Sequence, residues 1–378
     1  MATSPDFAAP PPQTGPVVVY GATGYTGKLV AAELDRRGAD FAIAGRSREK
    51  LDAVAATLSG PVSATAAALD DAAGLRALLD GAAAVIACAG PFVLHGEPVV
   101  SAAAETGTHY VDTTGEQPFM RSVFERWGPV AEPNGAALVT GMGFDYLPGD
   151  LIAGLTAAGL DRVDLMTLAY TVRGFGATRG TALSALGMLG ADDVEWVDGG
   201  FRDGSRNVAA GHFDFPSPIG RRRVGRYPAG EQITVPRHVD VGTLREVIDL
   251  ASVTPPALGP LAAPVMTGTG YLMETPVRGL VAKLIARLPE GPEERLRRAA
   301  RFTIVCEASG PQGHRRGVVR GSDVYGLTAV TTVEGALRMA APGYEGRGAL
   351  APAQAYDARN FLETLAPNGI SFGVEELD

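Results

Sequence analysis

The first third of the chain alternates short apolar runs with longer amphipathic stretches. The apolar runs cover 17–20, 41–44, 84–87, 109–112 and 137–140, and segments with helical spacing lie between them at 28–37, 49–58, 72–79 and 98–106. Most of these runs are apolar without alternation, which is typical of strands that are buried on both faces of a parallel sheet. This order predicts consecutive βαβ units.

The regular order ends near residue 143, and the rest of the chain mixes strands and helices. Strands are predicted at 163–172, 302–307 and 318–320, and helices at 178–189, 277–288, 323–339 and 355–365. A chain of 378 residues is longer than one hydrophobic core ordinarily serves. We therefore predict an α/β protein with a disordered lead-in over 1–15, a Rossmann-type parallel sheet domain over 16–148 and a second α+β substrate or dimerisation domain over 149–378. The last helix is a candidate to pack on the first domain.

An apolar stripe with basic neighbours runs along the predicted helix 277–288. The stripe contains Val277, Leu280, Val281, Leu284 and Leu288, and the basic residues on other faces are Arg278, Lys283 and Arg287. Two interpretations remain open. The helix either faces another domain or a second subunit, or lies on a membrane surface.

The composition excludes several classes of protein. The apolar fraction of 46% and the charged fraction of 20% are those of folded soluble proteins. The formal net charge of -9 argues against a general surface for nucleic acid or for an anionic membrane, since both need a basic face. Cys88 and Cys306 have no spacing that indicates a disulfide framework or a zinc site, so we expect no metal and a cytoplasmic location. No apolar run approaches the roughly 18 residues of a membrane span, so integral membrane association is not expected.

A glycine-rich turn follows the first predicted strand and precedes the first predicted helix. The turn consists of Gly21, Ala22, Thr23, Gly24, Tyr25, Thr26 and Gly27. In such a turn the first glycine allows a sharp bend, the second lets a pyrophosphate approach the backbone, and the third lets the helix pack closely on the strand. The helix start also presents N–H groups to an anion. Because a strand and a helix flank it, the turn predicts dinucleotide binding, with glycine packing alone as the alternative.

The end of the second strand predicts which dinucleotide is bound. An NAD-binding domain usually has an acidic residue there to hold the ribose 2′-hydroxyl, whereas this chain has Arg46 and Ser47. A guanidinium and a hydroxyl suit a 2′-phosphate, so we predict NADP as the cofactor, with a surface role for Arg46 as the alternative. Asp70 is a candidate adenine contact or, alternatively, a loop cap.

The strand at 84–87 is followed by residues that leave room for the nicotinamide ring. We expect the ring beside Ala89, Gly90, Pro91 and Phe92. His95, Asp145 and Tyr146 are the catalytic candidates, because they lie near predicted strand ends and can exchange protons or donate hydrogen bonds. Each has a structural alternative: a helix start for His95, a helix cap for Asp145 and core packing for Tyr146.

These strand ends resemble the saccharopine-dehydrogenase-like NADP-binding oxidoreductases. The resemblance rests on the glycine turn, on Gly90-Pro91-Phe92, on 107–112 with Gly115 and Glu116, and on 143–150. In the last segment Tyr146 and Gly149 stand where the family pattern Gly-Phe-Asp-Ser-x-Pro-Ser-Asp has serines. Similar segments at 178–184, 288–292 and 325–329 extend the resemblance over nearly the whole chain, and the branch it most resembles is that of the trans-acting enoyl reductases.

The resemblance implies an NADP-dependent oxidoreductase and leaves three functions open. The first is a reductase that transfers hydride to a C=C, C=O or C=N of a largely hydrophobic small molecule, such as a polyketide or lipid of secondary metabolism. The second is an imine dehydrogenase of an amino-acid substrate, similar to saccharopine reductase. The third is a non-catalytic NADP(H)-sensing protein. A carrier-protein-bound substrate and a homodimer are the partner interactions we consider.

Overall fold

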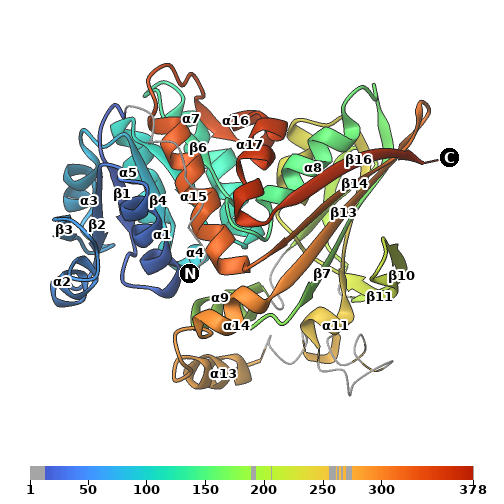
Figure 1. The fold of residues 1–378 in the computed structure, drawn as a ribbon, viewed down its shortest axis with the longest axis horizontal. Coiled ribbons are helices and arrows are strands. Elements are labelled where there is room, and N and C mark those ends of the chain that lie inside the picture. Colours follow the sequence, from blue (N-terminus) through green and yellow to red (C-terminus); the bar gives the residue numbers. More distant parts are fainter. Residues whose placement is uncertain are drawn as a thin grey trace. The chain divides into compact units, whose positions relative to one another are not determined.

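The computed structural model describes residues 13–188, 193–205, 207–254, 261, 264, 267–269 and 275–377. Its contacts divide the chain into two compact units. The first unit consists of Met1–Leu147 and Tyr325–Tyr356, and the second of Pro148–Val324 and Asp357–Asp378. Each unit contains a seven-stranded sheet (Figure 1).

The first unit is built on a parallel sheet with the strand order β15-β6-β5-β4-β1-β2-β3. Its strands are β1 (Val17–Tyr20), β2 (Phe41–Gly45), β3 (Ser63–Ala66), β4 (Ala84–Ala87), β5 (His109–Asp112), β6 (Ala137–Val139) and β15 (Gly348–Leu350). Its helices are α1 (Tyr25–Arg36), α2 (Arg48–Ala55), α3 (Ala72–Leu79), α4 (Phe92–His95), α5 (Glu97–Thr106), α6 (Gln117–Ser122), the π-helical η1 (Val123–Trp127), α7 (Gly128–Ala131), α15 (Val324–Ala340) and α16 (Pro352–Ala355). Strands β1 and β4 are buried along their whole length, which explains their uninterrupted apolar sequence.

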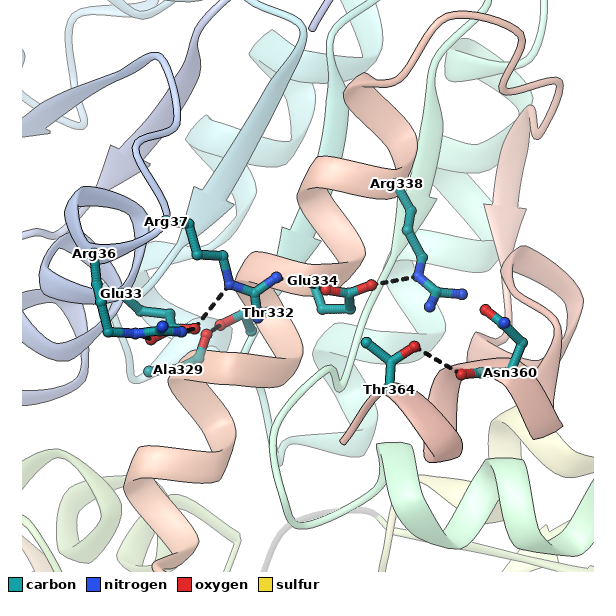
Figure 2. Close-up of polar contacts among 9 residues, drawn as sticks. All are labelled: Glu33, Arg36, Arg37, Ala329, Thr332, Glu334, Arg338, Asn360 and Thr364. Atoms are coloured by element: carbon teal, nitrogen blue, oxygen red, sulfur yellow. Dashed lines mark hydrogen bonds and ion pairs between the residues drawn. The ribbon is translucent and has the colours of Figure 1, made fainter. Parts of the chain in front are cut away.

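Helix α15 belongs to the first unit although most of the second unit precedes it in the sequence. An ion-pair network fixes it to α1: Arg37 pairs with Glu33 at 2.8 Å and with Glu334 at 2.5 Å, and Glu334 also pairs with Arg338 at 2.7 Å (Figure 2). Burial raises the pKa of Glu334, but the hydrogen bonds from Arg338 and Arg37 outweigh burial and hold this pKa below its usual value. Glu334 is therefore ionised and shared by both helices.

The second unit is built on a mixed sheet with the strand order β10-β11-β12-β7-β13-β14-β16. Its strands are β7 (Val163–Arg173), β10 (Ala209–Phe215), β11 (Gly220–Arg226), β12 (Val241–Asp249), β13 (Arg301–Gly310), β14 (Gly313–Ser322) and β16 (Ser371–Leu377), and β8 (Val194–Val197) and β9 (Gly200–Asp203) form a separate hairpin. Strands β7 and β12 run parallel, and the other neighbouring strands are antiparallel. Its helices are α8 (Leu147–Ala157), α9 (Arg179–Met188), α10 (Glu231–Thr234), η2 (Val235–Arg237), α11 (Leu250–Val253), α13 (Val277–Ile285), α14 (Glu294–Ala299), α17 (Ala358–Thr364) and η4 (Ala366–Asn368).

Glu231 and Glu246 are among the buried carboxyl groups of the second unit. The Tyr170 hydroxyl donates to Glu231, and the Ala229 N–H donates to Glu246 at 3.1 Å. Burial raises the pKa of Glu246 to about 8, against the hydrogen bonds from Gln232 and Ala229. Burial, together with the charge of Glu246, raises the pKa of Glu231 well above its usual value. Both carboxyl groups therefore retain protons in the folded state at a pH where free glutamate is ionised.

The same cluster explains why residue 149 is glycine, at the position where the pattern of the family that this chain resembles has a serine. A Cβ on Gly149 would lie 2.1 Å from Glu231 Oε1 and 2.1 Å from the Tyr170 hydroxyl oxygen. The next residue, Asp150, is fully buried and lies 2.9 Å from His238 Nε2. Burial lowers the pKa of His238, but the Asp150 carboxylate outweighs it and raises this pKa above its usual value.

The predicted fold class, a Rossmann-type parallel sheet with a second α+β unit, is confirmed. Strands β3 and β15 were not predicted, because β3 consists of small and polar residues at the sheet edge and β15 reaches the sheet from a distant part of the chain. The predicted boundary after residue 148 lies beside the division at Leu147, but 325–356, assigned to the second domain from sequence, lie in the first unit. The predicted last helix corresponds to α16 and α17, of which α17 lies in the second unit and not in the first.

The predicted lead-in over 1–15 lies largely outside the described residues, which begin at Gln13. Within the described ranges, no helix has the length and hydropathy needed to cross a membrane.

The buried pair predicts how stability depends on pH. The pKa of Glu246 is about 8 in the folded protein and about 4.3 in an unfolded chain, so its contribution to the free energy of unfolding is lost as the pH rises from about 5 to about 8. Replacing Glu246 with glutamine removes this titration while keeping a hydrogen-bond acceptor. We expect the free energy of unfolding of Glu246→Gln to vary by about 2 to 4 kcal/mol less over this pH range than that of the wild type.

Urea denaturation at a series of pH values measures this difference, and Glu363→Gln, an exposed position on α17, is the matched control. An unchanged pH dependence in Glu246→Gln would show that the carboxyl group is ionised in the folded state.

Candidate functional site

The carboxyl ends of β1 and β4 lie side by side at the point where the strand order of the first sheet reverses. The two strands pair in parallel with Tyr20 beside Ala87, and the Cys88 N–H donates to Tyr20 O at 2.9 Å. Gly21 follows β1 with a φ of +85°, and a Cβ there would lie 3.0 Å from Ala89 N. Glycine satisfies both the left-handed backbone and the close approach. Dinucleotides bind at such a switch point in open α/β sheets.

The two other glycines of the turn have different roles. A Cβ on Gly27 would lie 2.2 Å from Gly21 O, so glycine is needed for α1 to pack on the turn. Gly24 precedes α1 with φ −79° and ψ 168°, and the one atom within 4 Å of a Cβ there is Gly21 O at 3.5 Å. Gly24 is exposed, and Thr23, Tyr25 and Thr26 around it are partly exposed. The turn thus has an open face at the start of α1, which fits a diphosphate.

Arg46 and Ser47 lie between β2 and α2 and have different surroundings. The Arg46 side chain is exposed and makes no hydrogen bond or ion pair with the described residues. Arg48, by contrast, pairs with Asp52 at 2.8 Å and donates to Ala64 O at 3.0 Å. Ser47 Oγ accepts the N–H of Lys50 at 3.4 Å as the N-cap of α2, which leaves its O–H as a donor. Of the two arginines, Arg46 is the one available to an anionic ligand.

Asp70 lies next to the aspartate that caps α3. The cap is Asp71, whose carboxylate accepts the Gly74 N–H at 2.9 Å. The capping role considered for Asp70 is therefore filled by Asp71. Burial raises the pKa of Tyr20, the Arg46 charge lowers it and the Asp70 charge raises it. Asp70 and Arg46 therefore act on the same hydroxyl group, and Asp70 is exposed beside the predicted ribose end of the site.

The turn after β4 is held by Glu116. Both oxygens of this buried carboxylate accept backbone N–H groups, those of Phe92 and Val93, at 2.9 Å each. Phe92 packs on Phe119 with ring centroids 5.5 Å apart. Gly90 is exposed, and the adjacent residues Ala89 and Pro91 are partly exposed. The segment predicted to lie beside the nicotinamide therefore has a fixed backbone and an accessible surface.

Helix α4 presents an apolar surface next to this turn. Val93 is 45% exposed and Leu94 is 71% exposed. His95, the last residue of α4, is half-buried, and its imidazole forms no hydrogen bond within the part of the chain that the structure describes. Two exposed aliphatic side chains beside a predicted cofactor contact favour an apolar ligand.

Asp112 ends β5 and ties together the loops that follow β5 and β6. Its Oδ1 accepts the N–H groups of Thr114 and Gly141 at 2.9 Å each and the Thr140 hydroxyl at 3.1 Å. Burial raises the pKa of Asp112 to about 6, against these hydrogen bonds. Burial also raises the pKa of the nearby Cys88 thiol to about 12, so this thiol is not a nucleophile at neutral pH.

Asp145 and Tyr146 have contrasting environments. Tyr146 is buried, and its hydroxyl donates to Gly115 O at 2.7 Å, next to the carboxylate that holds α4. Asp145 is half-buried and makes no hydrogen bond with the described residues, and burial alone raises its pKa to about 6. A carboxyl group of this pKa exchanges protons near neutral pH. Tyr146 has the contacts of a positioning residue, and Asp145 has the properties of an acid.

Helix α15 adds contacts that the sequence did not predict. Tyr325 packs edge-on against Tyr25 of the glycine turn, with ring centroids 5.4 Å apart. Thr328 Oγ1 accepts the Phe144 N–H at 3.1 Å, immediately before Asp145. In the sequence, only the family resemblance draws attention to the segment 325–329. Its contact with the glycine turn could not be predicted, because the two segments are far apart along the chain.

Residues 17–130 match the family model for the saccharopine dehydrogenase NADP binding domain. The matched segment includes the glycine turn, Arg46, α4 and Glu116. Residues 17–130 belong to this domain family. The resemblance identified from the sequence is thereby confirmed for the NADP binding domain, a domain of oxidoreductases that bind a nicotinamide cofactor.

Several curated relatives match part of the chain. Trans-acting enoyl reductases of Mycobacterium tuberculosis and Mycobacterium leprae are each 39% identical over 140 residues, which are 36% of this chain and 34% of each relative. The match therefore spans about a third of the length of these relatives. The solved structure of apo saccharopine dehydrogenase (L-Glu forming) from Saccharomyces cerevisiae covers 96% of this chain and 100% of that one with a TM-score of 0.60 and 15% identity, a likeness of fold alone.

The glycine turn predicts opposite outcomes for two substitutions. Gly24→Val places its side chain where a diphosphate must approach, without a clash inside the fold, so we expect loss of NADPH binding with an unchanged circular dichroism spectrum. Gly27→Ala forces a Cβ to within 2.2 Å of Gly21 O, so we expect a lower melting temperature. Fluorescence titration with NADPH and thermal melting measure both effects. Wild-type affinity in a folded Gly24→Val variant would mean that the turn serves packing alone.

Proposed function

We propose that the protein is an NADPH-dependent reductase that transfers hydride to a C=C, C=O or C=N of a largely hydrophobic small molecule. The observation that carries the proposal is the open glycine turn at Gly24 together with the guanidinium of Arg46, which pairs with no described residue, both inside the matched NADP binding domain. Bound NADPH would supply the hydride. The side chains of the protein must then bind the cofactor, orient the substrate and deliver a proton.

Arg46 supports NADPH over NADH. The residue stands after β2, where an acidic side chain would select the ribose 2′-hydroxyl of NAD, and its five N–H donors suit a 2′-phosphate. The Ser47 hydroxyl can add a further donor from the N-cap of α2. A positive charge without an internal partner adds to the binding of a phosphate, because no ion pair has to be broken first.

Removing the Arg46 side chain tests this assignment. We expect Arg46→Ala to weaken NADPH binding by about 1 to 3 kcal/mol, or roughly 5- to 150-fold in Kd, with little effect on NADH. Arg48→Ala is the matched control, since Arg48 already pairs with Asp52, and it should leave both affinities unchanged. Isothermal titration with both cofactors measures the effect. Equal affinity of the wild-type protein for NADPH and NADH would contradict the assignment.

The surface beside the nicotinamide end supports an apolar substrate. Val93 and Leu94 are exposed on α4, directly after the turn at Gly90 and Pro91 that we expect to lie along the ring. The names of the relatives point to an enoyl group, so we favour C=C as the reduced bond and an acyl chain as the apolar part. An acyl chain attached to a carrier protein would present such a group to an open site.

Asp145 is our choice for the proton donor. It carries a raised pKa of about 6, forms no hydrogen bond with the described residues and follows β6, at the same edge of the sheet as the glycine turn. Tyr146 is held by Gly115 O and would have to leave this contact to donate a proton. His95 remains the alternative donor on α4.

Substitution of Asp145 tests its role. We expect Asp145→Asn to lower kcat by about 10²- to 10⁴-fold with unchanged NADPH affinity. In the wild type, kcat should fall above about pH 6 as Asp145 loses its proton. The pH profile of the Asp145→Asn variant should lack this decrease. Tyr146→Phe should change kcat by less than about tenfold and lower stability by about 0.5 to 1.5 kcal/mol, because it loses the bond to Gly115.

NADPH oxidation with a trans-2-dodecenoyl thioester as the probe provides the rates. A full rate in Asp145→Asn would remove Asp145 from the mechanism and leave the reductase intact. Absence of oxidation with enoyl, enone and imine probes, in a protein that binds NADPH, would contradict the reductase itself and favour a sensing protein.

A further inference from the structure

Helix α13 of the second unit has an apolar stripe that is exposed among the described residues. None of its residues is buried. Leu280 is 62% exposed and Leu284 is 55% exposed, and the exposed Val277 and Leu288 extend the stripe at either end. Exposed aliphatic side chains are ordinary when they are scattered, but Val277, Leu280 and Leu284 on one face of α13, continued by Leu288 just after the helix, form a patch.

The geometry of the helix separates this stripe from the side that packs on the protein. At 100° per residue, Val277, Leu280 and Leu284 fall within an arc of about 60°. Val281 and Ile285 lie on the adjacent arc and are half-buried, in keeping with the packing of α13 beside α9 (Figure 1). The helix is therefore anchored by one set of apolar residues and presents another set outward.

Basic residues border the outward stripe on its other side. Lys283 and Arg287 are exposed and form no ion pair or hydrogen bond through their side chains with the described residues. The segment 276–289 contains three basic residues and no acidic residue, in a chain whose formal net charge is -9. The positive charge is thus concentrated beside the exposed leucines, although the protein as a whole is acidic.

We propose that α13 is an interfacial helix that docks the protein on an anionic lipid surface. Leucines at the boundary between headgroups and acyl chains, with lysine and arginine at the level of the lipid phosphates, are the arrangement of helices that lie in a membrane surface. A symmetric contact with a second copy would bring Lys283 and Arg287 of both copies together without an acidic partner on the helix, which opposes that occupant. This proposal does not depend on the reductase activity.

Vesicle flotation tests the proposal with two kinds of vesicle, phosphatidylcholine alone and phosphatidylcholine with phosphatidylglycerol. We expect the full chain to float with the phosphatidylglycerol vesicles at least tenfold more than with phosphatidylcholine alone, and the bound fraction to fall with added salt. Leu280→Ser/Leu284→Ser and Lys283→Glu/Arg287→Glu should each reduce the bound fraction at least tenfold. Because these side chains are exposed, melting temperature and NADPH affinity should stay at wild-type values.

Val374→Ser on β16, where the side chain is 37% exposed, is the matched control and should float like the wild type. Failure of the wild type to bind phosphatidylglycerol vesicles, or full binding by the double serine variant, would overturn the proposal. A dimer in solution that Leu280→Ser/Leu284→Ser dissociates would assign the stripe to a second copy and would also overturn it.

Discussion

The close approach of helix α1 to the turn after β1 is the constraint on which the first unit depends. A Cβ on Gly27 would lie 2.2 Å from Gly21 O, so the helix can rest on the turn only because residue 27 is glycine. This contact directs the start of α1 toward the switch point between β1 and β4. It also sets the position of Arg37 just beyond the far end of α1, where the network with Glu334 fixes α15. One steric condition therefore orients the candidate anion site and anchors a distant segment.

The roles of the polar residues divide into positioning and chemistry. Asp112 Oδ1 and both carboxylate oxygens of Glu116 accept backbone N–H groups, so these two residues hold the loops after β4, β5 and β6 in place. Arg46 and Asp145 make no hydrogen bond with the described residues, which leaves them to a ligand. A folded protein ordinarily satisfies its half-buried polar groups internally, so an unpartnered carboxyl group of raised pKa is informative about function.

Local patterns in the sequence were sufficient to predict five strands of the parallel sheet and the glycine turn between the first strand and helix, because each depends on residues that are near one another in the chain. Contacts that depend on distant segments were not predictable in this way. Tyr325 packs on Tyr25 because α15 lies in the first unit, although the two residues are far apart in the sequence. Strand β3 lies at the edge of the sheet and contains Ala64 and Thr65, so no apolar run marks it in the sequence. The hydrogen bond from the Tyr146 hydroxyl to Gly115 O favours a positioning role for Tyr146, whereas the sequence alone does not favour either packing or catalysis.

A crystal structure of the complex with NADPH tests the central claim most directly, since the claim concerns where the cofactor binds. The account predicts the diphosphate against the backbone N–H groups at the start of α1, beside Gly24, and the 2′-phosphate within hydrogen-bonding distance of Arg46. A diphosphate bound away from Gly24, or a 2′-phosphate out of reach of Arg46, would contradict it.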